Sequence, residues 1–328
     1  MKKIAFCFMT YSCINHEDIW RSWFNGIEKD KYALYITQSH PDKKTPVGYF
    51  KDNIIPSRET KYYNKSIVGC QVDMISAALK DEDVTHIIFL SGSHIPVKKF
   101  SQVYDNMSST CLHDITPRNM DREFKVQGLI KNFRKLIKSS QWAVYTRDHA
   151  EDIAYTINNE TLDTLCPRGK YDISAAPDEI ILQSYLLSNY PEGEFNITQN
   201  DPENSPTFEY WNYNRSYKYN KHFTSTTPEE WKNRIKTYYI IEQEEIDHLT
   251  DDCSCLFMRK VSDNCVVLDY DNPRKDYERE LNTLYTDLFT LIYSIAKNEI
   301  HHVSSKLLTT LNRIKVTTLT DYIVPKIT

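Results

Sequence analysis

The segment Thr85–Phe100 constrains the fold of this chain more than any other stretch. It begins with a compact apolar run, Ile87–Leu90, whose length and residue types are typical of a strand buried on both faces of a sheet. The strand is expected to end at Ser91-Gly92-Ser93-His94, and Pro96 prevents a simple continuation. Ligands of open α/β sheets bind beyond the carboxyl ends of the strands, so these four polar residues are a candidate site. An ordinary strand followed by an ordinary turn is the alternative.

Strand and helix patterns alternate on either side of this segment. The predicted strands are Lys3–Phe8, Tyr32–Thr37 and Ala143–Thr146, in addition to the central one, and the predicted helices cover Ile19–Ile27, Ile67–Leu79, Ser101–Met107, Asp148–Asn158 and Ile180–Leu187. Strands separated by helices predict an α/β fold with a mostly parallel sheet flanked by helices.

The end of the chain follows a different pattern. Between Lys275 and Glu299 apolar residues recur at alternating steps of four and three, and a second amphipathic segment, Val303–Ile314, follows. We therefore expect a sheet domain over residues 1–268 and a C-terminal helical hairpin over residues 269–328. Two roles stay open for the hairpin: docking on its own domain, or a homodimer contact.

Composition excludes several classes of function. The net charge of −5 argues against a nucleic-acid partner, and with only 7 glycines there is neither a Walker sequence nor a GxGxxG motif. The apolar run Ile4–Met9 is too short for a signal peptide, and no run reaches membrane-spanning length. We expect no membrane span, reduced cysteines and a location in the cytoplasm, either of a cell or of a virus-infected host. Cys253-Ser254-Cys255 near His248 is half of a metal-binding pattern, and unliganded thiols are the alternative.

A carboxylate pair precedes one of the predicted helices. Asp178 and Glu179 follow Pro177, and Glu179 is expected in the first turn of the helix Ile180–Leu187. The positive end of the helix dipole favours a charged carboxylate there, as a general base requires. Proline and acidic residues also begin helices for structural reasons alone, and this alternative stays open.

Several short segments together resemble one enzyme family. The segments, in order, are Trp20–Phe24, Ile55-Pro56-Ser57 with Ser66-Ile67-Val68, Phe89-Leu90-Ser91 with Ile95-Pro96, Ser140-Gln141-Trp142, Pro177-Asp178-Glu179 and Leu256-Phe257-Met258-Arg259-Lys260. Their order and spacing resemble the core-2/I-branching glycosyltransferases, including the plant-type relatives and the peptide O-xylosyltransferases. The resemblance covers about residues 3–262 and leaves out the helical tail.

The resemblance implies a GT-A-type fold and an inverting reaction. A sugar, N-acetylglucosamine or xylose, would pass from a UDP-sugar to a hydroxyl of a glycan or glycoprotein acceptor. Family members work without a metal or other cofactor. In this chain Ser91-Gly92-Ser93-His94 stands where metal-dependent relatives carry an Asp-x-Asp pair, so cationic side chains would neutralise the departing diphosphate.

The resemblance also assigns roles to residues. Glu179 matches the catalytic base and Lys260 the phosphate-binding lysine. Further donor-side candidates are Arg259, Thr10, Ser66, Ser91 and one cation among Arg215, Lys218 and Lys221, and the acceptor-side candidates are Trp142, which would stack on a sugar, Asp178 and Ser93.

The chain departs from the family pattern at two places. Thr37-Gln38-Ser39-His40 replaces an acidic pair used near the uracil, and Tyr62 or Tyr63 replaces a tryptophan. Two alternatives therefore remain: a retaining or metal-dependent transferase, and a degenerate member that binds nucleotide or glycan without catalysis.

Overall fold

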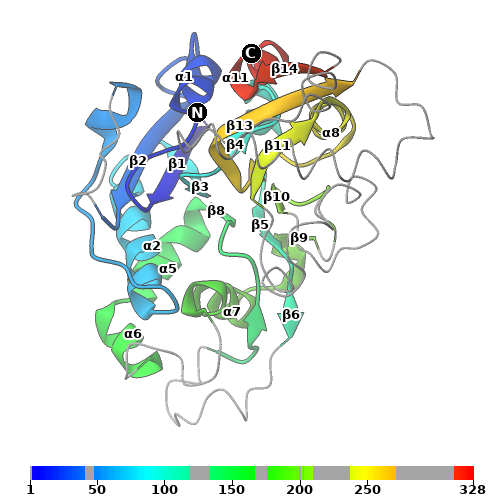
Figure 1. Ribbon diagram of the computed structural model, residues 1–328. Coiled ribbons are helices and arrows are strands. Elements are labelled where there is room, and N and C mark those ends of the chain that lie inside the picture. Colours follow the sequence, from blue (N-terminus) through cyan, green and yellow to red (C-terminus); the bar gives the residue numbers. More distant parts are fainter. Residues whose placement is uncertain are drawn as a thin grey trace.

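A six-stranded sheet of order β2-β1-β3-β8-β5-β9 forms the centre of the computed structural model, which describes residues 2–40, 48–117, 133–166, 176–198, 201, 203–209, 237–270 and 314–328 (Figure 1). Its strands are β1 (Lys3–Thr10), β2 (Tyr32–Gln38), β3 (Val84–Ser91), β5 (Thr110–His113), β8 (Val144–Thr146) and β9 (Phe195–Thr198). β1 pairs in parallel with β2 and β3, and β5 pairs in parallel with β9. Only β8 is antiparallel to its neighbours in this sheet. The prediction of a mostly parallel sheet in an α/β fold is confirmed.

Alternation along the central strands buries both faces of the sheet. In β1, Phe6 and Phe8 enter one apolar cluster while Ala5 and Cys7 enter the other. Because successive side chains point to opposite faces, a strand can be apolar throughout only where both faces are covered. The predicted burial of the central strand is confirmed: Ile87–Leu90 is at most 2% exposed.

Helices cover the two faces. The helices are α1 (Glu17–Phe24), α2 (Lys65–Ala78), α3 (Phe100–Asn106), α5 (Arg147–Thr156), α6 (Asn159–Leu165), α7 (Ile181–Asn189), α8 (Gln243–Asp247) and α11 (Leu319–Ile327). The apolar sides of α2, α5, α6 and α7 join one cluster, whereas those of α1, α3, α8 and α11 join the other, which is rich in aromatic rings. Figure 1 shows α2 beside α5 and, near the two termini, α1 beside α11. Within the described ranges, no helix has both the length and the apolar character that crossing a membrane requires.

Short strands form three smaller sheets around this centre. One has the order β10 (Thr207–Glu209), β12 (Phe257–Arg259), β4 (Ile95–Pro96), and the second has the order β11 (Tyr238–Glu242), β13 (Val261–Tyr270), β14 (Ile314–Thr318). The third pairs β6 (Thr116–Pro117) with β7 (Ile137–Lys138), and the remaining short turns are η1 (Gly48–Asn53), η3 (Pro177–Glu179), η4 (Glu192–Glu194) and the π-helical η6 (His248–Asp252). In the first sheet β4 brings the segment after the central strand against β12.

The described part of the C-terminal segment differs from the predicted hairpin. The boundary expected after residue 268 falls inside β13, and Ile314–Thr318 is a strand that pairs with β13 rather than the end of a helix. Leu319, Ile323 and Ile327 of α11 are buried in the aromatic-rich cluster. Burial of this apolar stripe joins the end of the chain to the sheet domain. The heptad segment lies outside the described residues, and so does the predicted dimer contact.

A close backbone contact fixes the turn after the central strand. The carbonyl of Gly92 accepts a hydrogen bond from the Asn15 amide at 2.6 Å, so the loops after β1 and β3 touch. A Cβ atom built on Gly92 would lie 2.4 Å from the Cys13 carbonyl oxygen. Only glycine allows this approach of two backbones, and the contact sets the shape of the carboxyl edge of the sheet.

We predict that Gly92→Ala destabilises the protein by about 1–3 kcal/mol, because the new methyl group forces the two loops apart. Gly193→Ala is the matched control, since a Cβ atom there meets no atom within 4 Å. Urea unfolding of both variants measures the two losses of unfolding free energy. Equal losses would contradict the proposed role of the Gly92 contact.

Candidate active site

Glu179 occupies a turn of its own in front of α7. It ends the 3₁₀ helix η3, and Ile180 leaves helical geometry with φ −125° and ψ −50° before α7 begins at Ile181. The predicted location in the first turn of the following helix is therefore wrong: Glu179 lies directly before Ile180, the N-cap residue of α7. The η3 turn is held by its main chain, since the Glu179 carbonyl accepts from the Ser139 amide at 2.8 Å.

Lys138 orients the Glu179 carboxylate. Its Nζ atom lies 2.9 Å from Glu179 Oε2, and the two side chains are 34% and 20% exposed. Lys138 ends β7, directly before the serine that holds the η3 backbone. The carboxylate is thus anchored on one side and open to solvent on the other, as an acceptor hydroxyl would require.

Asp178 differs sharply from its neighbour. Its side chain is 3% exposed, and Oδ1 has no hydrogen-bond partner among the described residues. Burial, and secondarily the negative charge of Glu179, raises the pKa of Asp178 to about 7. Two adjacent carboxyl groups therefore have different environments: Asp178 is buried, whereas the Glu179 side chain is 20% exposed and contacts Lys138.

A buried ion pair links the sheet β10-β12-β4 to the segment that holds the η3 turn. Arg259 at the end of β12 contacts the Glu209 carboxylate at the end of β10 through Nη1, and the two side chains are 9% and 3% exposed. The guanidinium also lies over the Trp142 ring, 4.5 Å from its centroid. Ser140 Oγ donates to the second Glu209 oxygen at 3.3 Å, which connects the pair to the segment that holds Glu179.

Trp142 is buried, whereas a ring that stacks on a sugar has an exposed face. It is 5% exposed, with Arg259 over the ring and His94 in edge contact at 5.0 Å between centroids. The described contacts make it a support for the guanidinium. Sugar stacking on Trp142 stays a prediction.

Lys260 follows Arg259 but faces a different environment. Arg259 is 7% exposed, whereas Lys260, directly after the end of β12, is partly exposed. The neighbouring Val261 amide donates to the Ser93 carbonyl at 2.9 Å. The chain thus places Lys260 next to the turn after the central strand.

The polar turn after β3 is closely hydrogen-bonded. Ser91 Oγ lies 2.8 Å from His94 Nδ1 and 3.0 Å from Ser93 Oγ. His94 is fully buried, and burial together with the charge of Arg259 holds its pKa well below the ordinary value. A neutral imidazole in this position is a hydrogen-bonding group rather than a cation. The central strand therefore ends in a polar turn whose side chains are hydrogen-bonded to one another.

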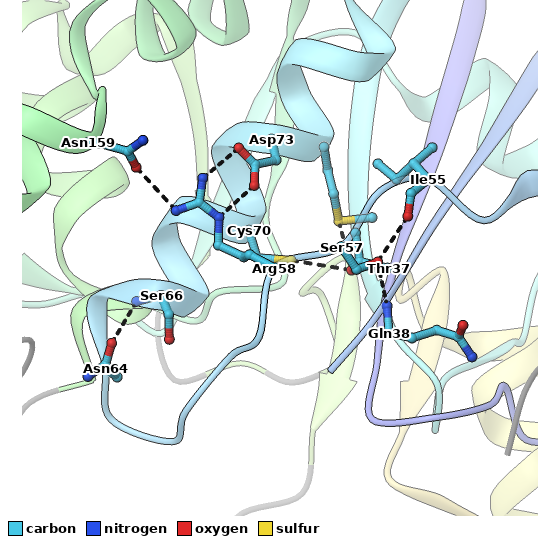
Figure 2. Close-up of polar contacts among 11 residues, drawn as sticks. Thr37, Gln38, Ile55, Ser57, Arg58, Asn64, Ser66, Cys70, Asp73 and Asn159 are labelled. Carbon is cyan, nitrogen blue, oxygen red and sulfur yellow. Dashed lines mark hydrogen bonds and ion pairs between the residues drawn. The ribbon is translucent and has the colours of Figure 1, made fainter. Parts of the chain in front are cut away.

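Thr10 and Ser66 use their hydroxyl groups within the fold. Thr10 is 4% exposed and donates to the Thr37 carbonyl at 2.8 Å. Ser66 Oγ accepts from the Lys61 amide at 2.9 Å, while Asn64 caps α2 by accepting from the Ser66 amide (Figure 2). Their donor-binding roles stay predictions.

Arg58 holds the segment after β2 against α2. Figure 2 shows its guanidinium against Asp73 of α2, with nitrogen–oxygen distances of 2.6 and 2.7 Å, and against Asn159 at 3.2 Å. The arginine passes over Gly69, where a Cβ atom would lie 2.1 Å from Nη1. This arrangement fixes the loop that carries Ser57, whose hydroxyl accepts from the Gln38 amide at 3.0 Å.

Several buried polar atoms around Arg259 lack a hydrogen-bond partner among the described residues. They are Asp178 Oδ1, both ring nitrogens of His113, His94 Nε2 and Arg259 Nε. Buried polar groups are nearly always paired, and each exception requires a reason. Ordered water between these groups would pair them.

One group near Glu179 has metal-ligand chemistry. His113, Asp114 and Glu209 offer ligand atoms within 4.8 Å of one another, and burial with the charge of Glu209 raises the pKa of Asp114 to about 6. The same Glu209 carboxylate already contacts Arg259, whose positive charge opposes a divalent ion. These residues fit a bound hydroxyl or water better than a metal.

Sequence patterns missed Lys138, Asp114 and Glu209. Lys138 directly precedes the Ser-Ser-Gln-Trp segment, which was a usable signal, whereas no spacing connects the other two to Glu179. Arg215, Lys218 and Lys221, the candidates for a second phosphate cation, lie outside the described residues.

The model of the core-2/I-branching enzyme family matches residues 4–235. Since this is well over half of the sequence, the chain belongs to the core-2/I-branching enzyme family, and the predicted family is confirmed. A curated rice (Oryza sativa subsp. japonica) protein, glycosyltransferase BC10, is 28% identical over 166 residues. That match covers 45% of this chain and 39% of the rice protein, so the chain spans well under half of its relative.

Similarity to solved structures is weaker. The galactosyltransferase LgtC, solved with donor and acceptor sugar analogues, has a TM-score of 0.38 at 8% identity, covering 94% of this chain and 99% of LgtC. A197 from STIV has a TM-score of 0.24 at 9% identity, covering 48% and 69%. At these scores neither structure carries an argument about this site.

We predict that Asp178→Asn stabilises the protein at pH 8 relative to wild type but has little effect at pH 4. The folded state of wild type keeps the Asp178 proton up to about pH 7, whereas the unfolded chain loses it near the ordinary pKa of 3.8. Wild-type stability therefore falls as pH rises through this window, by roughly 2–4 kcal/mol, and asparagine has no proton to lose.

Urea unfolding at both pH values tests this expectation, with the exposed Asp83→Asn as the control. A difference between Asp178→Asn and wild type that stays constant with pH would contradict it.

Proposed function

We propose that this chain is an inverting glycosyltransferase that moves a sugar from a UDP-sugar to an acceptor hydroxyl without a metal. The observation that carries the proposal is the half-open Glu179 carboxylate, held by Lys138 beside the cationic end of β12. Family membership and the name of the rice relative support transfer of a sugar. N-acetylglucosamine and xylose are the two sugars proposed, with a glycan or glycoprotein as the acceptor.

Glu179 would act as the general base. As the acceptor oxygen attacks the anomeric carbon, its proton passes to the Glu179 carboxylate, and the bond between that carbon and the UDP oxygen breaks on the opposite side. One displacement inverts the anomeric centre. Lys138 holds the carboxylate in place before the proton arrives, and the buried Asp178 stays neutral beside it for much of the relevant pH range.

Lys260 would stabilise the departing diphosphate. Lys260 matches the phosphate-binding lysine of the family and is partly exposed next to the turn after β3, so the proposal gives it the phosphate contact. Glu209 and Trp142 hold the Arg259 guanidinium, which makes Arg259 a positioning residue. Charge developing on the leaving oxygen is stabilised by a cation fixed in advance, which does the work of a divalent ion in other enzymes.

A metal-dependent transferase is the rival, and its candidate metal ligands would be His113, Asp114 and Glu209, although Glu209 already contacts Arg259. The two hypotheses differ in their response to manganese. Transfer that proceeds at the same rate without manganese and with it supports the cationic mechanism, whereas a strict requirement for manganese supports the rival.

Glu179→Gln is expected to lower the rate of sugar transfer by roughly 10²- to 10⁴-fold, the usual contribution of general base catalysis. UDP affinity should be unchanged, because the amide keeps the shape of the side chain and the proposed phosphate contact lies elsewhere. Product formation from a panel of UDP-sugars and UDP titration calorimetry measure the two effects, with Glu82→Gln, an exposed residue, as the control.

Transfer by Glu179→Gln at the wild-type rate would place the base elsewhere. If wild type binds UDP and transfers none of the sugars to any acceptor of a glycan panel, the non-catalytic binder becomes the better hypothesis.

Lys260→Ala should weaken UDP binding by roughly 10- to 100-fold, the value of one lost charge-assisted contact, and leave uridine binding nearly unchanged. Calorimetry with both ligands, using the exposed Lys51→Ala as the control, separates the phosphate contact from the contacts to the base and ribose. Equal losses for UDP and uridine would show that Lys260 does not bind phosphate.

A further inference from the structure

A second cluster with metal-ligand chemistry lies in the segments that lead into β10 and β12. Glu203 Oε1 is 3.1 Å from His248 Nε2, and one ligand atom each of Glu203, His248 and Cys253 lie within 4.8 Å of one another. Cys255, two residues after Cys253, is fully buried, and its backbone lies against Glu203, whose carbonyl accepts from the Cys255 amide. Carboxylate, imidazole and thiol groups therefore converge from two segments far apart in the sequence.

Backbone hydrogen bonds bring the two segments of this cluster together. The amides of Ser254 and Cys255 both donate to the Glu203 carbonyl at 2.9 Å, and the Cys253 amide donates to the His248 carbonyl at 3.1 Å. The second bond closes the π-helical turn η6, a rare conformation that is frequent at functional sites. The main chain thus brings Glu203, His248 and Cys253 together, with Cys255 on the adjoining backbone.

A carboxylate outside the cluster orients the imidazole. Asp252 Oδ2 lies 3.0 Å from His248 Nδ1, so the other ring nitrogen, Nε2, faces Glu203 and Cys253. Histidine ligands of metals usually donate their second ring N–H to a carboxylate in this way. The two thiols are buried, whereas the Glu203 side chain is 37% exposed and leaves a route from solvent.

From these contacts we propose that Glu203, His248, Cys253 and Cys255 bind one zinc ion. Thiolate and imidazole donors favour zinc over calcium and magnesium, which prefer oxygen ligands. Tetrahedral zinc with bonds of about 2.0–2.3 Å places its ligand atoms roughly 3.3–3.8 Å apart. The Glu203–His248 distance of 3.1 Å is close to that range, and the other separations among Glu203, His248 and Cys253 are within 4.8 Å. Side-chain rotations would then close the site around the ion and bring in Cys255.

The bound zinc would position Arg259 through the strands. Glu203 lies just before β10 and Cys255 just before β12, where the Pro206 carbonyl accepts from the Leu256 and Phe257 amides at 3.0 and 3.1 Å. The two strands then carry Glu209 and Arg259 into the candidate active site. A cross-link at their beginnings fixes the register that brings the ion pair together.

Metal analysis of the full-length protein, purified under reducing conditions, tests the proposal without nucleotide or acceptor, so its outcome is independent of the proposed function. We expect one zinc per chain, and cobalt added after removal of zinc should give the thiolate-to-cobalt absorption band. Cys253→Ser and His248→Ala should reduce both signals to background. Cys255→Ser should reduce the intensity of the cobalt band. Cys265→Ser, which removes a buried thiol elsewhere, should keep the wild-type signals.

If a variant of a buried residue fails to fold, Glu203→Gln takes its place, because the Glu203 side chain is partly exposed. We expect Glu203→Gln to bind zinc more weakly than wild type. The proposal is overturned if wild type takes up neither metal stoichiometrically or if Cys253→Ser binds zinc as tightly as wild type. It is also overturned if mass spectrometry finds a Cys253–Cys255 disulfide in the protein prepared with reductant.

Discussion

The buried contact between Glu209 and Arg259 is the interaction on which the candidate site depends. Removing one partner of a buried ion pair commonly costs about 3–5 kcal/mol, because the remaining charge is left without compensation. The pair also connects two parts of the fold: its strands belong to the sheet β10-β12-β4, and Ser140 and Trp142 connect it to the segment that holds Glu179. The position of the proposed base relative to the cationic strand end therefore rests on this pair.

Charge is divided within the site in a consistent way. Arg259 compensates Glu209 in the interior, Lys138 compensates Glu179 at the surface, and the buried Asp178 has its pKa raised. A second charged carboxylate next to the proposed base would repel it or could take the acceptor proton in its place. Burial keeps the proton on Asp178 up to about pH 7, so below that pH Asp178 carries no charge beside Glu179.

The sheet was predictable because its signals are local. The apolar run Ile87–Leu90, its polar end and the helical periodicities lie within single segments, and burial on both faces follows from them. The η3 turn was mispredicted because Pro177 and two acids begin a 3₁₀ turn as readily as an α-helix. The partner of Arg259 could not be predicted, since Glu209 reaches it only through the pairing of β10 with β12. Lys138 contacts Glu179 because the backbone of Ser139 binds the η3 turn, and only the adjacent Ser-Ser-Gln-Trp segment points to it.

The arrangement of β4, β12 and β10 explains why the site residues are so scattered in the sequence. β12 pairs with β10 on one side and with β4 on the other, so one short strand touches both the Glu209 segment and the turn after β3. Its end therefore delivers Arg259 inward to the ion pair and leaves Lys260 beside Ser93. Any displacement of β12 along its axis would move both cations together. Contacts that fix its beginning, near Cys255, consequently act on the site at its end.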